Sequence, residues 1–134
     1  MAHRRPNFSS RKNHQAKPLG YLLHLYMTIV AQLTPTDLQK RVESGELWRI
    51  LDVREPWEIE IANIAGTMNI PMNEVPARYD ELSVEAGIAV LCHSGVRSGR
   101  VADWLAGNGF EHVANIVGGI DAWSAQLDGS IQRY

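Results

Sequence analysis

Residues 88–98, IAVLCHSGVRS, decide the fold of this chain. An unbroken apolar run at residues 88–91 ends at Cys92, and small or polar residues follow it. A continuous run of this kind is typical of a central parallel strand that is covered on both faces. Ligands of parallel α/β sheets bind outside the carboxyl ends of the strands. We therefore expect the loop that begins at Cys92 to lie at the functional edge of a sheet.

Short apolar runs alternate with helical patterns on both sides of this stretch. The expected strands are residues 28–32, 48–53, 67–70, 88–91 and 113–117. The expected helices are a segment between Thr34 and Gly45, residues 57–62, 98–108 and 120–127, with helical turns within 73–82. Right-handed crossovers between such strands predict an α/β fold of three layers, with a central five-stranded parallel sheet and helices on both faces.

Length, charge and cysteine content exclude several classes of protein. A chain of 134 residues has room for one domain. Residues 18–134 hold eight Lys or Arg against fifteen Asp or Glu, a net charge of −7, so we expect no nucleic-acid partner for this part. Cys92 is the one cysteine, which excludes an internal disulfide and a cysteine cluster.

Residues 1–26 are predicted to be a disordered basic extension, and residues 27–134 the domain. Residues 1–17 carry five Lys or Arg and no acid. The apolar run at 21–33 is interrupted by His24 and is too short to span a bilayer, so no membrane partner is expected. An extension without function, a transit peptide and a signal peptide all remain open. The predicted location is cytoplasmic, with organellar or exported destinations as alternatives.

The loop after residue 91 has the composition of an anion-binding site with a nucleophile. Gly95 lets the backbone curl with a positive φ, and a curled loop before a helix turns its N–H groups inward. Arg97 adds a positive charge at the rim, and both features favour a thiolate at Cys92. The chemistry predicted is attack by sulfur on an anionic substrate. The alternative is that Cys92 is an inert, small hydrophobic residue.

Several motifs in order make the chain resemble the rhodanese-like sulfurtransferases in a single-domain form, over residues 29–123. These motifs are LDVREP at 51–56, IAGTMNIP at 64–71, CHSGVRS at 92–98, GNGF at 107–110 and NIVGGIDAW at 115–123. The resemblance implies that Cys92 takes a sulfane sulfur from a donor such as thiosulfate, forms a persulfide, and passes the sulfur to cyanide, a thiol or a protein. It also implies that the substrate is held by the residues after the cysteine: His93, Ser94, Gly95, Val96, Arg97 and Ser98.

Two other functions remain open beside sulfur transfer. Phosphatases of the same fold have a cysteine loop one residue longer than this one, which has four residues between Cys92 and Arg97, so a phosphatase or arsenate-type enzyme is the weaker enzymatic alternative. A non-catalytic binding or regulatory module is the other, although such modules often lose the cysteine. The chain departs from the family pattern at Asn63, where members commonly carry a histidine that affects local packing or substrate access.

Asp52 and Arg54 are candidates for supporting the loop. In the functional interpretation, Asp52 orients the loop through a hydrogen bond, and Arg54 is a second cation or a partner for Glu55. In the alternative, these residues form an ordinary ion pair at the end of the strand. His93 has two interpretations, as a residue that tunes Cys92 or as one that points to solvent. The histidines are not combined with other ligands at metal spacing, so neither a metal nor another cofactor is expected. The expected partners are a small anionic sulfur donor and a thiol or protein acceptor.

Overall fold

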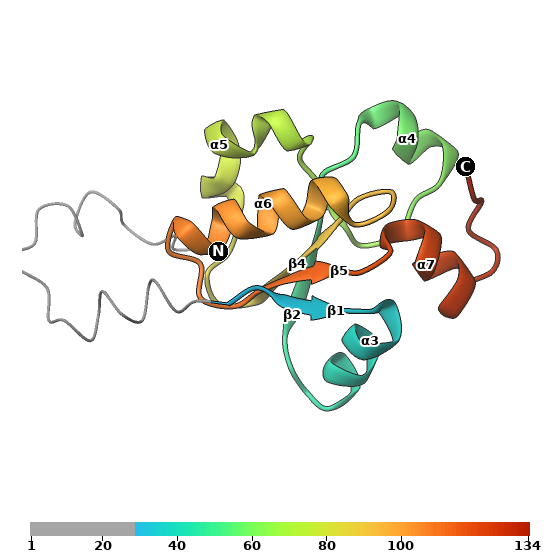
Figure 1. The fold of residues 1–134 in the computed structure, drawn as a ribbon, viewed down its shortest axis with the longest axis horizontal. Coiled ribbons are helices and arrows are strands. Elements are labelled where there is room, and N and C mark those ends of the chain that lie inside the picture. Colours follow the sequence, from blue (N-terminus) through green and yellow to red (C-terminus); the bar gives the residue numbers. More distant parts are fainter. Residues whose placement is uncertain (1–28) are drawn as a thin grey trace, which may run out of the picture.

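The structure, a computed structural model, describes residues 29–134 and has at its centre a five-stranded, wholly parallel sheet (Figure 1). The predicted disordered extension, residues 1–26, lies outside the described residues. The strands are β1 (Ala31–Leu33), β2 (Trp48–Asp52), β3 (Met68–Asn69), β4 (Gly87–Leu91) and β5 (Val113–Ile116), in the order β1-β5-β4-β2-β3. The predicted sheet is therefore confirmed.

Helices cover both faces of the sheet, which confirms the predicted three layers (Figure 1). They are α3 (Pro35–Glu43), α4 (Pro56–Ile61), α5 (Val75–Arg78), α6 (Val96–Gly107) and α7 (Gly119–Gln126), with 3-10 turns η1 (Met72–Glu74) and η2 (Tyr79–Glu81). One apolar cluster joins α5 and α6 to the sheet, and a second joins α3 and α7 to its other face. Among residues 29–134, no helix is both long and apolar enough to cross a membrane.

Strand β4 occupies the middle of the sheet, between β2 and β5, and every one of its residues is buried. This agrees with the unbroken apolar run from which the fold was predicted. A strand with neighbours on both edges and helices on both faces needs apolar side chains on both sides. The chain leaves β4 at Cys92, at the carboxyl edge of the sheet, where the segments after β2 and β5 also emerge.

The first turn of α6 begins at Val96, two residues earlier than predicted. Gly95 has φ of 102°, in the left-handed region, and it caps the helix. A glycine with this φ turns the backbone sharply at a single residue, so the helix starts at the next residue. The loop after β4 is consequently shorter than predicted, and Val96, Arg97 and Ser98 belong to the helix. Strand β1 also differs, since it begins at Ala31; residue 28, where its start was predicted, is not described.

Candidate active site

Cys92 lies directly after β4, and only 1% of the residue is exposed. The backbone N–H of Gly95 donates a hydrogen bond to its Sγ, at 3.1 Å between N and S. This bond exists because the loop curls back within three residues, which the positive φ of Gly95 allows. A sulfur that carries negative charge is stabilised by such a donor. The predicted inward N–H is thus present at this position.

A second polar contact of the sulfur comes from Ser98, in the first turn of α6. Its Oγ is 3.2 Å from Cys92 Sγ, and its hydroxyl donates to Asn115 Oδ1 at 2.6 Å. Ser98 is fully buried and Asn115 is 7% exposed. The pair therefore forms a short polar chain that runs from the sulfur to strand β5.

The segment after β5 supports the loop through its backbone. The N–H of Ile120 donates to the carbonyl of Cys92 at 2.9 Å, and that of Asp121 to the carbonyl of His93 at 3.3 Å. Gly119 has φ of 59°, and a Cβ there would overlap the carbonyls of Cys92 and His93. The absence of a side chain at Gly119 thus lets two chain segments approach closely.

Arg97 forms an ion pair with Glu58 of α4, a residue that the sequence patterns did not single out. Its two terminal nitrogens donate to the two carboxylate oxygens of Glu58, each at 2.7 Å. The side chain of Glu58 is 4% exposed and that of Arg97 is 31% exposed. This pairing lowers the pKa of Glu58 to about 2 and raises the pKa of Arg97 above its usual range. An arriving anion would meet an arginine whose charge is largely balanced.

Arg54 and Asp52 form the buried ion pair that was one of their two expected roles. The guanidinium is 2.8 Å from the carboxylate of Asp52, and neither side chain is exposed. The other donors of Arg54 bind the carbonyls of Glu58 and Ala62 and the hydroxyl of Tyr134. All five N–H groups are thus occupied, which leaves none for an anion or for Glu55. The alternative in which Arg54 is a second cation is not supported by this geometry.

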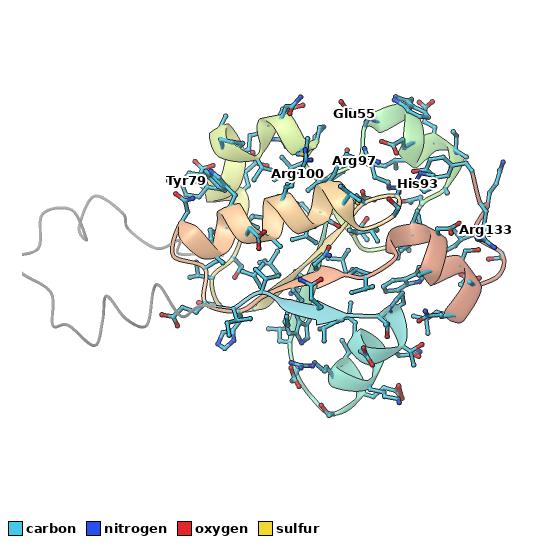
Figure 2. All side chains as sticks on the ribbon, viewed as in Figure 1. Glu55, Tyr79, His93, Arg97, Arg100 and Arg133 are labelled. Carbon is cyan, nitrogen blue, oxygen red and sulfur yellow. The ribbon has the colours of Figure 1, made fainter. Side chains whose placement is uncertain are left out.

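His93 follows Cys92 and packs against Tyr134, the last residue of the chain. The two rings are stacked, 4.1 Å apart at 11°. The hydroxyl of Tyr134 donates to Glu58 at 2.9 Å and accepts from Arg54 at 3.0 Å, and burial raises the pKa of Tyr134. Figure 2 shows His93 and Arg97 at the same end of α6, close to α4. His93 is half-buried, which differs from the interpretation in which its side chain points to solvent.

The structure brings only part of the predicted set to the sulfur. Gly95 and Ser98 contact it, whereas Ser94 and Val96 are exposed. Within residues 29–134, no three His, Cys, Asp or Glu side chains are grouped so as to hold a metal ion.

Three residues of this region were missed by the sequence reasoning. Asn115 had a detectable signal, since it is the one polar residue in the strand VANI. Glu58 forms a capping box with Glu55, a local pattern that gives no hint of Arg97. Tyr134 had no signal, because its contacts join positions far apart in the sequence.

In this parallel α/β domain, a cysteine follows a buried strand, and a loop with a glycine connects it to the next helix. The cysteine is therefore a candidate nucleophile. A family model for rhodanese-like domains matches residues 34–126. The chain belongs to the rhodanese-like domain family.

Individual relatives agree with the family match. The chain is 36% identical over 99 residues to the putative sulfur carrier protein YrkF of Bacillus subtilis, covering 74% of this chain and 54% of the relative. It is 30% identical over 96 residues to a sulfurtransferase of Allochromatium vinosum, covering 72% and 90%. A rhodanese-related protein from Thermoplasma volcanium has a similar structure, with a TM-score of 0.65 and 30% identity over 72% of this chain and 93% of that one. Other curated relatives are longer, and the chain spans 30% of one from Arabidopsis thaliana.

Proposed function

We propose that the chain is a sulfurtransferase, which moves a sulfane sulfur from an anionic donor such as thiosulfate to a thiophilic acceptor through a persulfide on Cys92. The observation that carries the proposal is the position of Cys92 Sγ, at the carboxyl end of the central strand with the N–H of Gly95 directed at it. The names of relatives such as the Allochromatium vinosum sulfurtransferase support the same chemistry.

The first step of the proposed reaction is attack by the Cys92 thiolate on the outer sulfur of thiosulfate. A new S–S bond forms to Cys92, the S–S bond of thiosulfate breaks, and its electron pair leaves with sulfite. In the second step the acceptor attacks the outer sulfur of the persulfide, and the electron pair of that bond returns to Cys92. No external oxidant or reductant is needed, as in thiol–disulfide exchange.

Donor binding in this proposal relies on the loop and on the outer face of Arg97. Two nitrogens of Arg97 donate to Glu58. An anion can therefore bind only the remaining N–H groups of Arg97, and it is attracted by the charge of Arg97 that Glu58 does not balance. Because Glu58 balances the charge of Arg97, we expect the donor to bind more weakly than it would to an unpaired arginine.

The acceptor is proposed to be a thiol or a protein thiol. Cys92 has no second cysteine in the chain to resolve a persulfide, so the sulfur has to leave to another molecule. The relative YrkF is named a putative sulfur carrier, which is consistent with a protein acceptor. Val96, at the start of α6, and Trp57 of α4, whose ring contacts that of Tyr134, are 62% and 60% exposed, which leaves this region open to a partner.

The location of the protein is proposed to be cytoplasmic, with an organellar or exported destination if residues 1–26 are a targeting segment. Sequencing the N-terminus of the protein isolated from its source distinguishes these cases. An intact N-terminus supports the cytoplasmic location, and so does a start at Met27 itself, because this methionine is an in-frame start. A start produced by cleavage at another position contradicts it.

Formation of thiocyanate from thiosulfate and cyanide tests the proposed function. We expect turnover by the wild type and none by Cys92→Ser, with wild type pretreated with iodoacetamide as a second inactive sample. Hydrolysis of p-nitrophenyl phosphate is measured in parallel. Phosphatase activity without thiocyanate would favour the phosphatase alternative, and neither activity would favour a binding module.

A further inference from the structure

Asn115 is a buried polar residue in a strand that is otherwise apolar. All four residues of β5 are buried, and the other three are Val113, Ala114 and Ile116. A buried amide without partners is costly, so its hydrogen bonds decide which way it faces.

The orientation of the Asn115 amide is fixed by its neighbours. Its nitrogen donates to Gln32 Oε1 at 3.0 Å and to the carbonyl oxygen of Gly95 at 3.2 Å, which uses both of its hydrogens. A backbone carbonyl only accepts, so the amide nitrogen must face Gly95. The amide oxygen is thereby directed at Ser98.

Ser98 has a single hydroxyl hydrogen, and the geometry assigns it to Asn115. The distance from Ser98 Oγ to Asn115 Oδ1 is 2.6 Å, whereas that to Cys92 Sγ is 3.2 Å. The serine oxygen then presents only lone pairs to the sulfur. This arrangement suits a thiol, which donates its hydrogen to Ser98. It opposes a thiolate, which has no hydrogen to donate.

We propose that Asn115 is a positioning residue that holds the hydroxyl hydrogen of Ser98 away from the Cys92 sulfur, and so limits how readily this sulfur becomes a thiolate. The Gly95 N–H acts in the opposite direction, since it stabilises the charged sulfur. Donation from Ser98 to a thiolate requires its hydrogen to rotate from Asn115 to sulfur, with loss of the shorter bond. The consequence for catalysis rests on the proposed function, but the titration of the sulfur does not.

Other charged groups near the loop stay the same when Asn115 is changed. Arg97 of α6 interacts electrostatically with Cys92 and is paired with Glu58 of α4. His93 lies within the loop, and Asp121 of α7 interacts electrostatically with it. Substitution of Asn115 also removes its hydrogen bond to the carbonyl of Gly95, whose N–H binds the sulfur. Comparison with a Ser98→Ala background is therefore what assigns a change to the hydrogen bonds of Ser98.

The test is the pH dependence of alkylation of Cys92 by iodoacetamide in Asn115→Leu, which has similar size and no hydrogen-bonding atoms. We expect the midpoint to fall by about one pH unit, or about tenfold more thiolate below the midpoint, because Ser98 is free to donate to sulfur. In a Ser98→Ala background the same substitution is expected to have no effect. Gln39→Leu, an exposed position on α3, is the matched control and should leave the midpoint unchanged.

Asn115→Val, which suits a strand, replaces the leucine variant if that protein fails to fold. An unchanged midpoint in a folded variant overturns the proposal. So does a shift of equal size in the Ser98→Ala background, because the effect then does not pass through Ser98. Alkylation uses no sulfur donor, so absence of thiosulfate turnover in the wild type would refute the proposed function and leave this result standing.

Discussion

Replacement of Glu58 by Gln tests the ion pair that the structure places beside the cysteine loop. Glu58 accepts from both terminal nitrogens of Arg97, from the hydroxyl of Tyr134, and from the N–H of Glu55. Glutamine has the same length and keeps an oxygen for the N–H of Glu55. The substitution therefore removes the charge and half of the bidentate pair while preserving the start of α4.

The magnitude follows from the pKa of Glu58, which Arg97 lowers from an ordinary value of 4.5 to about 2. A difference of this size corresponds to about 3 kcal/mol of folding free energy at neutral pH. The side chain of Arg97 is 31% exposed, so water screens part of the interaction. We expect Glu58→Gln to lower the free energy of unfolding by about 2 kcal/mol, below the range for fully buried pairs.

The pH dependence of this loss has a definite sign. Because the pKa of Glu58 is lowered on folding, its contribution is complete above about pH 4.5 and is lost as the pH falls toward 2. Urea unfolding of the wild type and Glu58→Gln at about pH 7, 5, 4 and 3 is the assay. The difference between the two proteins should be constant at the upper two values and shrink at the lower two. Glu43→Gln, at an exposed position of α3, is the control and should match the wild type.

Two results would refute this reasoning. One is a difference in unfolding free energy below about 0.5 kcal/mol at neutral pH, which is the range of ordinary surface substitutions. The other is a large difference that stays constant from pH 7 to about 3, because a loss that does not titrate would come from packing and not from the charge of Glu58.

Three further substitutions probe the site. Arg97→Ala should lower the free energy of unfolding by about 3 kcal/mol, measured in urea, because it leaves the buried Glu58 charge unpaired, and adding Glu58→Gln to this variant should restore most of the lost free energy. The thiosulfate KM of the double variant is expected to be higher than that of the wild type. An unchanged KM would mean that Arg97 does not bind the donor. Gly119→Ala should lower the melting temperature and slow alkylation of Cys92, because its Cβ overlaps the loop carbonyls, whereas Gly129→Ala, with open space around it, should be near neutral. Asp52→Asn should cost about 3 kcal/mol by urea unfolding, and a loss as small as that of an exposed ion pair would contradict full burial.

Local patterns predicted the fold well because each was short-range in the sequence. The apolar run of β4 and a helix that starts directly after Thr34 were both confirmed. The structure adds a capping box between Thr34 and Asp37. The start of α6 was placed two residues too late. Its composition suggested a loop up to Ser98, whereas the left-handed Gly95 lets the helix begin immediately.

The candidate site was less predictable, because its polar contacts connect distant parts of the chain. Arg97 was expected to present a free charge, but 39 positions separate it from the carboxylate that pairs with it. No periodicity or local motif encodes that contact. The same holds for Tyr134, which reaches Arg54 across 80 positions. Asn115 is the exception, since a polar residue inside an apolar strand is by itself a sign of a buried hydrogen-bond network.

The central claim, a persulfide on Cys92, is tested most directly by mass spectrometry of the protein after incubation with thiosulfate and removal of excess donor. We predict a gain of about 32 Da, one sulfur atom, located on the peptide that contains Cys92 and removed by a thiol or cyanide. Cys92→Ser should gain nothing under the same conditions. The incubation uses a thiosulfate concentration at which the thiocyanate assay shows turnover. If Cys92 of the folded protein stays unmodified under these conditions, the account is contradicted.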